Sequence, residues 1–213
     1  MTAREIYDLA RGGGNDFQAI VELLERLGEP WCLIGGLAVN AYAEPVYTTD
    51  ADFVIVATQL EFVCAELAGL GFTISHHFGV NAQLPGSSLI VQFTTDPRYQ
   101  DFLARAAPDE VLGVQCRVAA LVDLFQGKLW AAADPERRPT KRAKDELDLL
   151  RIPEILAALA DGASSPAREM TLCKSNSYPS PMLSSLAGKN WSMIRSWHGG
   201  RAELRLTGWG GSS

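Results

Sequence analysis

The chain has 213 residues, of which 47% are hydrophobic and 21% charged, and its formal net charge is −6. This composition excludes a largely disordered protein, and no run approaches the ~18 apolar residues that a membrane span needs. The first residues show no signal-peptide pattern, and the four cysteines are far apart with no C-x-x-C pair. We therefore expect a cytoplasmic protein with reduced thiols and no membrane partner.

The totals hide a division of the chain. Residues 1–161 carry 13 Lys+Arg and 23 Asp+Glu, net −10, whereas residues 162–213 carry six and two, net +4. The second part also holds eleven of the fourteen serines. We expect one domain over 1–161 and a Ser/Gly-rich basic tail over 162–213 that is poorly ordered. A flexible tail and a change of reading frame are both open explanations of the shift.

Apolar periodicity, capping residues and glycines predict the elements of the domain. In chain order, we expect a helix capped by Asn15 and ended by Gly28, a strand Trp31–Ile34, a helix Leu37–Ala43, a strand Asp52–Val56, and a helix capped by Thr58 through Leu70. Three strands follow, Phe72–Ser75, Val80–Leu84 and Leu89–Phe93, and then a helix Arg98–Ala106 after Pro97. The last elements are a strand Val114–Val118, a helix Ala119–Ala133, a polar loop Asp134–Thr140, and helices Lys141–Arg151 and Pro153–Leu159. This interleaving predicts an α/β fold, a mixed sheet flanked by helices, with a C-terminal helical segment. In the tail we expect only a helical turn at Met182–Ala187 and a strand at Ala202–Leu206.

A glycine pair and an aspartate pair are the residues that most clearly indicate a functional site. Gly35 and Gly36 follow the first strand, and Asp50 and Asp52 lie at the head of the next one. Residues i and i+2 of a strand face the same way, so the two carboxylates would lie side by side, which is unfavourable without a cation between them. Mg²⁺ bound through both carboxylates and substrate phosphates fits that need. The helix after the glycines would direct its free N–H groups at phosphate. A tight turn with two solvated aspartates is the alternative.

The stretch Leu33-Ile34-Gly35-Gly36-Leu37-Ala38 with Thr48-Thr49-Asp50-Ala51-Asp52-Phe53-Val54-Ile55 resembles the signature of the DNA polymerase β-like nucleotidyltransferase superfamily. The resemblance implies a nucleotidyltransferase-like fold. It also implies that Gly35, Gly36 and Thr48 bind the nucleotide substrate, and that Asp50 and Asp52 are catalytic and bind Mg²⁺.

Two later segments resemble the paired motifs of the AbiEii/MenT toxin-type nucleotidyltransferases. They are Leu124-Phe125-Gln126-Gly127-Lys128-Leu129-Trp130-Ala131-Ala132 and Lys144-Asp145-Glu146-Leu147-Asp148-Leu149-Leu150. The resemblance implies catalytic roles for Lys128 and Asp145, and substrate binding by Lys128, Arg142 and Asp148. It also implies a nucleoside triphosphate, a tRNA or protein acceptor, and an antitoxin partner.

From the residues alone, the side chains of these later segments have more than one possible role. Lys128 lies on an otherwise apolar helix face, so its amine either snorkels at the edge of the core or reaches phosphates in a cleft. Asp145 and Asp148 share a helix face and would pair with Lys128 or Arg142, contact the nucleotide, or form a salt-bridged surface. Five basic residues lie nearby: Arg137, Arg138, Lys141, Arg142 and Lys144. They form either a solvated charged segment or a binding site for a triphosphate or an RNA backbone.

The sequence also departs from the superfamily pattern. A third carboxylate usually lies on a later strand, but the matching position here is Gln92, and a neutral amide does not replace a carboxylate. Asp96 would serve only if that strand were longer or bent. Val46 stands where an arginine is often found. We therefore expect a Mg²⁺-dependent nucleotidyltransferase, with two alternatives: a catalytically silent nucleotide- or partner-binding domain, and a small-molecule, antibiotic-type nucleotidyltransferase.

Overall fold

The computed structural model describes residues 16–76, 79–160, 190–198 and 201–209. Its elements are α2 (Asp16–Leu27), β1 (Trp31–Ile34), α3 (Gly35–Tyr42), β2 (Asp50–Ile55), η1 (Ala57–Gln59), α4 (Leu60–Gly69), β3 (Thr73–Ser75), β4 (Val80–Gln83), β5 (Ile90–Thr94), α5 (Pro97–Gln100), α6 (Phe102–Arg105), β6 (Ala107–Val111), β7 (Val114–Val118), α7 (Leu121–Ala133), α8 (Pro139–Ala160), β8 (Asn190–His198) and β9 (Arg201–Trp209).

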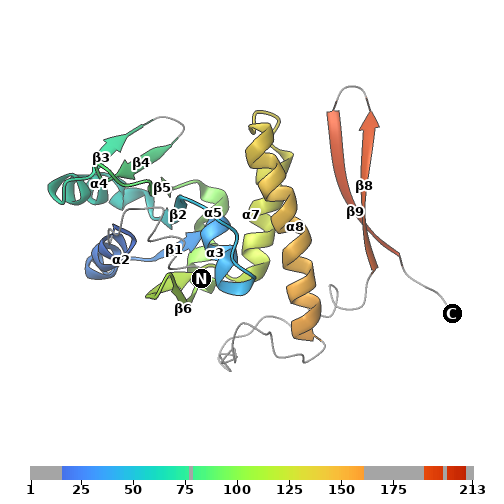
Figure 1. Cartoon of the computed structure of the whole chain (residues 1–213), viewed down its shortest axis with the longest axis horizontal. Helices are drawn as coiled ribbons and strands as arrows, with labels where there is room; N and C mark the ends of the chain where they lie inside the picture. The colour runs from blue at the N-terminus through green and yellow to red at the C-terminus, as the bar shows by residue number, and fades with distance from the viewer. Residues whose placement is uncertain (1–15, 77–78, 161–189, 199–200, 210–213) are drawn as a thin grey trace.

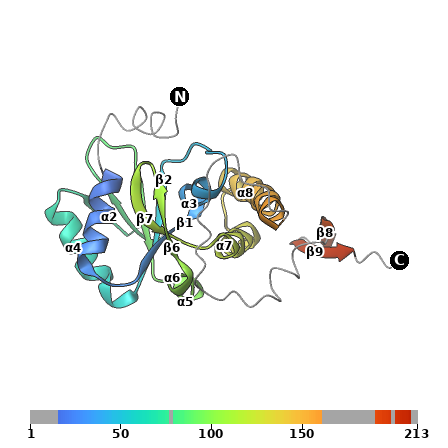
Figure 2. The same cartoon turned by 90° about the horizontal axis from the view of Figure 1, so that it is seen from below.

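Seven strands form one mixed sheet in the order β3-β4-β5-β2-β1-β7-β6. The β2–β5 and β1–β7 pairs are parallel, and the other pairs are antiparallel. Helices α2 and α4 cover one face of the sheet, and α3, α7 and α8 lie on the other (Figures 1 and 2). The predicted fold class, a mixed sheet flanked by helices with a C-terminal helical segment, is confirmed. None of the described helices is long and apolar enough to cross a membrane.

The core lies where the two central strands meet the flanking helices. Phe53 of β2 has no exposed surface, and its ring lies 5.8–6.0 Å from those of Phe17, Trp31 and Phe93. The four residues of β1 are all buried, which is why this strand reads as a continuous apolar run. The packing fixes which face of β2 turns inward, and thereby the direction of its polar residues.

Several predicted boundaries are wrong. The helix expected from Leu37 begins at Gly35, and the strand expected from Asp52 begins at Asp50. Thr58 does not cap a helix: it lies inside the 3₁₀ turn η1, and α4 begins at Leu60. The helix expected over 98–106 is divided into α5 and α6.

Two further differences have clear physical causes. β6 was not predicted, because a segment containing Pro108 and two acidic residues is a poor strand former; such residues are tolerated on an edge strand, and β6 pairs only with β7. The helices expected on either side of Pro153 form one helix, α8. Leu149 and Ile152 are buried just before the proline, so their packing holds the helix through it.

The tail predictions fall partly on the described residues. The strand expected at Ala202–Leu206 lies within β9, which pairs with β8 in a separate two-stranded sheet. The turn expected at Met182–Ala187 and the cysteine at 173 lie outside the described residues. Cys32, Cys64 and Cys116 are free thiols, and burial raises the pKa of Cys32 and Cys116 to about 12. The division at residue 161 and the disorder of the tail stay predictions.

Candidate active site

The junction between β1 and α3 places a bare backbone segment against Asp52. Ile34, the last residue of β1, is the antiparallel partner of Asp52, and Gly35 follows with φ +75°. A Cβ on Gly35 would lie 2.9 Å from Cγ of Asp52 and nearer still to its Oδ2. Glycine is therefore required here twice, for the left-handed backbone and for the space that the Asp52 carboxylate occupies. Gly36 opens toward Thr48, since a Cβ on Gly36 would lie 3.9 Å from the Thr48 hydroxyl oxygen.

The alternation of β2 sends both aspartates to the same side. Ala51 and Phe53 are fully buried in the core, so Asp50 and Asp52 face the layer that holds α3, α7 and α8. This confirms the side-by-side placement that the D-x-D spacing predicts. The amide N–H of Asp50 donates to the Thr48 hydroxyl at 3.3 Å, which fixes the turn into the strand.

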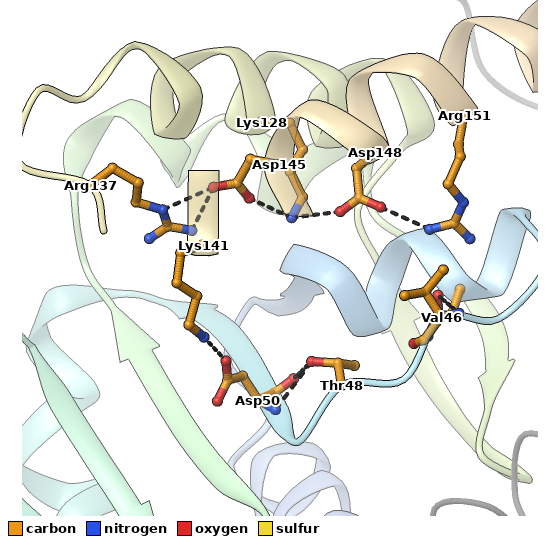
Figure 3. Close-up of polar contacts among 10 residues, drawn as sticks. Val46, Thr48, Asp50, Lys128, Arg137, Lys141, Asp145, Asp148 and Arg151 are labelled. Carbon is orange, nitrogen blue, oxygen red and sulfur yellow. Dashed lines mark hydrogen bonds and ion pairs between the residues drawn. The ribbon is translucent and has the colours of Figure 1, made fainter. Parts of the chain in front are cut away.

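The two carboxylates differ in their surroundings. Lys141, in the first turn of α8, forms an ion pair with Asp50 across 91 positions of sequence (Figure 3). Among the residues that the structure describes, no side chain forms a hydrogen bond or ion pair with Asp52. Burial raises the pKa of Asp52, although the charges of Lys128 and Arg137 act in the opposite direction. Asp52 is thus a partly buried carboxylate whose negative charge lacks a direct partner.

The third-carboxylate position is occupied as the sequence predicts. β5 lies parallel to β2, and Gln92 is the register partner of Asp52. Its amide donates to Oδ1 of Asn81 on β4 at 2.7 Å. Asp96 does not take over this place, because β5 ends before it and its carboxylate caps α5 and pairs with Arg98 at 2.6 Å.

Helices α7 and α8 meet through a row of alternating charges (Figure 3). The Lys128 ammonium lies 2.9 Å from Asp145 and 2.8 Å from Asp148, and all three residues are buried. Arg137 pairs with the outer oxygen of Asp145, and Arg151 with that of Asp148, each at 2.8 Å. Burial lowers the pKa of Lys128, but the two carboxylates together raise it above its ordinary value. Of the alternatives for these residues, the structure shows mutual pairing.

Arg142 lies apart from this row. Its guanidinium donates to the carbonyls of Asp134, Pro135 and Arg137, at 2.7, 3.4 and 3.4 Å. It therefore holds the loop between α7 and α8 in place and does not line the pockets at the aspartate pair. The loop in turn carries Arg137, for which the sequence predicts no role beyond its place in a basic run.

Two pockets share one wall. The large pocket, about 240 Å³, extends over β1, β2, β5 and α7, and the small one, about 60 Å³, lies between α3, the segment before β2, and α8. Four residues line both pockets: Asp52, Lys128, Arg137 and Asp145. Gly35, Gln92 and Tyr99 belong to the large pocket.

Most of the remaining predicted site residues belong to the small pocket. Its lining includes Gly36, Thr48, Asp50, Lys141, Lys144 and Asp148. The structure thus brings together every predicted site residue except Arg142. Lys141, Arg137 and Tyr99 were missed as individual site residues; the clustered cations were the only sequence signal for the first two.

The carboxylate pair fits a magnesium ion that takes its other ligands from the phosphate oxygens of a nucleotide. Asp50 and Asp52 provide hard oxygen donors on one face, and a divalent cation would relieve the uncompensated charge of Asp52. No group of three or more His, Cys, Asp or Glu side chains that could hold a metal occurs among the described residues. The protein therefore supplies two ligands here, and phosphate oxygens would have to supply others.

Comparison with known proteins finds similarity in structure only. No protein-family model matches the chain, and no curated protein matches it. The solved antibiotic-resistance factor ANT(2″)-Ia is 14% identical, with a TM-score of 0.49 over 68% of this chain and 90% of that one. A nucleotidyltransferase-like protein from Paracoccidioides brasiliensis is 16% identical, with a TM-score of 0.49 over 64% of this chain and 73% of that one. Lincosamide antibiotic adenylyltransferase LnuA is 14% identical, with a TM-score of 0.47 over 65% and 95%.

Of these three structures, one is a nucleotidyltransferase-like protein, one an antibiotic adenylyltransferase and one an antibiotic-resistance factor. The nearer resemblance to AbiEii/MenT toxin-type enzymes stays a prediction. At such low identity, the functional assignment depends on the side chains of the site itself.

Proposed function

We propose that this protein is a nucleotidyltransferase that transfers a nucleoside monophosphate from a triphosphate to an acceptor hydroxyl. One observation supports this above all: the Asp50–Asp52 pair lies on the wall of a cleft whose other side is lined by cations of α8 and the preceding loop. Phosphoryl transfer requires carboxylates that hold a metal ion and, facing them, cations that neutralise the phosphates.

The residues divide the work between them. Asp50 and Asp52 would hold Mg²⁺, which when bound would neutralise charge on the phosphate oxygens. Gly36 and Thr48 would bind the triphosphate from one side of the small pocket, and Lys141 and Lys144 from the other. The acceptor oxygen attacks the α-phosphorus, and the bond between the α-phosphorus and the oxygen that bridges it to the β-phosphorus breaks. Pyrophosphate leaves, and the hydroxyl proton passes to solvent.

Lys128, Asp145 and Asp148 take a supporting part in this proposal. Because the Lys128 amine is already held by two carboxylates, its position is fixed at the wall shared by both pockets. Asp145 fixes Arg137 at the same wall, so Arg137 is the cation of this row best placed to meet phosphates. Arg142 contributes indirectly, by holding the loop that carries Arg137.

The acceptor is the open part of the proposal. A tRNA end or a protein hydroxyl, and with it an antitoxin partner, follows from the toxin-type resemblance. A small molecule is the alternative acceptor; among the similar structures, ANT(2″)-Ia is an antibiotic-resistance factor and LnuA a lincosamide antibiotic adenylyltransferase. The large pocket, about 240 Å³, would take the acceptor group next to Asp52 in either case.

A second candidate function has its own observation. Gln92 occupies the register position beside Asp52 and is held by Asn81, so no third carboxylate from β5 faces the pair. A site with only two carboxylates supports a domain that binds a nucleotide without transferring it.

One experiment separates these candidates. Purified protein is incubated with Mg²⁺, each α-labelled nucleoside triphosphate in turn, and total tRNA, cell extract or an aminoglycoside and lincosamide mixture. We expect transfer by the wild type, its loss in Asp50→Asn, and wild-type transfer in Asp101→Asn, an exposed aspartate outside both pockets. Magnesium-dependent nucleotide binding without transfer to any acceptor would favour the silent domain. Absence of nucleotide binding would refute both candidates.

A further inference from the structure

We propose that Lys141 couples metal binding to nucleotide binding, by occupying Asp50 until a nucleotide phosphate takes over its amine. This inference rests on the proposed function and concerns how the same site is regulated. In this inference Lys141 contacts Asp50 in the free protein and a phosphate in the nucleotide complex, and it takes no part in bond formation.

The first step is that Lys141 is the direct counter-charge of the pair. Its ammonium is ion-paired with Asp50 (Figure 3). Lys128 lies on the same cleft wall, but its amine is held by Asp145 and Asp148. Within the described part of the chain, no other cation is in ion-pair contact with Asp50 or Asp52. A metal ion that binds to the Oδ2 oxygen of Asp50 therefore has to displace the Lys141 ammonium from that oxygen.

The second step concerns where the displaced amine can go. Lys141 lines the small pocket together with Gly36 and Thr48, on the side that the proposed function gives to the triphosphate. Its side chain is about one-third exposed, at 31%, so it can move without breaking the core. The neighbouring carboxylate Asp145 is already paired with Lys128 and Arg137. A phosphate oxygen is thus the partner that would best replace Asp50.

A thermodynamic consequence follows from this exchange of partners. A metal ion that takes this oxygen without a nucleotide breaks the Lys141–Asp50 ion pair and leaves the amine without a partner, so it binds weakly. A metal ion with a nucleotide supplies both a cation for Asp50 and a phosphate for Lys141. Each ligand therefore raises the affinity for the other, and the coupling is reciprocal.

The chain provides a matched control in Lys144. It lies three residues further along α8, lines the same small pocket, and is exposed. It forms no ion pair with any residue that the structure describes. Replacing Lys144 removes the same charge from the same pocket and leaves Asp50 paired.

The test measures binding, with Mn²⁺ and a non-hydrolysable nucleoside triphosphate as probes, by calorimetry on the full chain. We expect Lys141→Met to bind Mn²⁺ alone about tenfold more tightly than the wild type, within the usual range of coupling between sites. Lys144→Met should bind Mn²⁺ as the wild type does. The ratio of nucleotide affinities with and without saturating Mn²⁺ should also fall about tenfold in Lys141→Met only.

Other outcomes separate the two proposals. Equal Mn²⁺ affinities in Lys141→Met, Lys144→Met and the wild type would overturn the inference while leaving the proposed function intact. A wild type that binds no nucleotide, with or without Mn²⁺, would overturn the proposed function and this inference with it. If Lys141→Met does not fold, Lys141→Gln takes its place, and Lys141→Arg, which keeps the charge, should retain wild-type Mn²⁺ binding.

Discussion

Substitution of Gly35 by alanine tests the contact that positions Asp52. The backbone at Gly35 has φ +75°, and a left-handed conformation costs an alanine about 1–2 kcal/mol. The new Cβ would also lie 2.9 Å from Cγ and 3.1 Å from Cβ of Asp52. Carbon atoms prefer about 3.5–4.0 Å, so the Asp52 side chain must retreat by about half an ångström or more. Such overpacking adds about 1–3 kcal/mol.

Gly28 provides the matched control for this substitution. Its φ is +72°, and a Cβ there would meet nothing within 4 Å. Gly28→Ala should therefore lose only the cost of the left-handed backbone, about 1–2 kcal/mol. Urea unfolding followed by circular dichroism measures both variants, and calorimetry measures their affinity for Mn²⁺ with a nucleotide. We expect Gly35→Ala to lose more stability than Gly28→Ala and to lose binding as well. Equal stabilities and unchanged binding would refute the close approach of Gly35 to Asp52.

Two other predictions concern the charges of the site. Lys128→Met leaves two buried aspartates with one arginine each, so we expect a loss near the lower end for a broken buried ion pair, about 3 kcal/mol by urea unfolding. The exposed control Lys144→Met should stay within about 0.5 kcal/mol of the wild type, and a Lys128→Met loss below about 1 kcal/mol would contradict the row of ion pairs. Burial raises the pKa of Asp52, so the folded protein binds a proton there more tightly than the unfolded chain does. The ionised carboxylate therefore lowers the free energy of unfolding as pH rises above about 4. Thermal melts should show Asp52→Asn more stable than the wild type at pH 7, with the difference shrinking toward pH 4. If the wild type is the more stable of the two at pH 7, the charge of Asp52 is compensated by neighbouring cations.

Much of the fold could be predicted from local sequence. The all-apolar run of β1 was placed at its correct bounds, because a strand buried on both faces leaves a continuous apolar signal. That prediction depends only on neighbours within a few residues. The place of Gln92 beside the aspartate pair was implied by the superfamily resemblance, and the structure confirms it, because Gln92 is the register partner of Asp52.

The failed predictions involve distant contacts. The sequence of β6 opposes strand formation, and only pairing along its whole length with β7 makes it a strand. Pro153 normally interrupts a helix, but the burial of Leu149 and Ile152 against the rest of the domain keeps α8 continuous. In both cases tertiary packing outweighs local propensity.

The sequence by itself singled out residues that the structure brings together at the two pockets: the glycine pair, the two aspartates of β2, and Lys141 and Lys144 of the basic segment. Only the tertiary structure decided how these charges pair. It places the Lys128 ammonium between Asp145 and Asp148 at the wall of both pockets, and it joins Lys141 to Asp50 from 91 positions away. The reason is physical: motifs follow the local period of a strand or helix, whereas the partner of a partly buried charge depends on which elements pack against it.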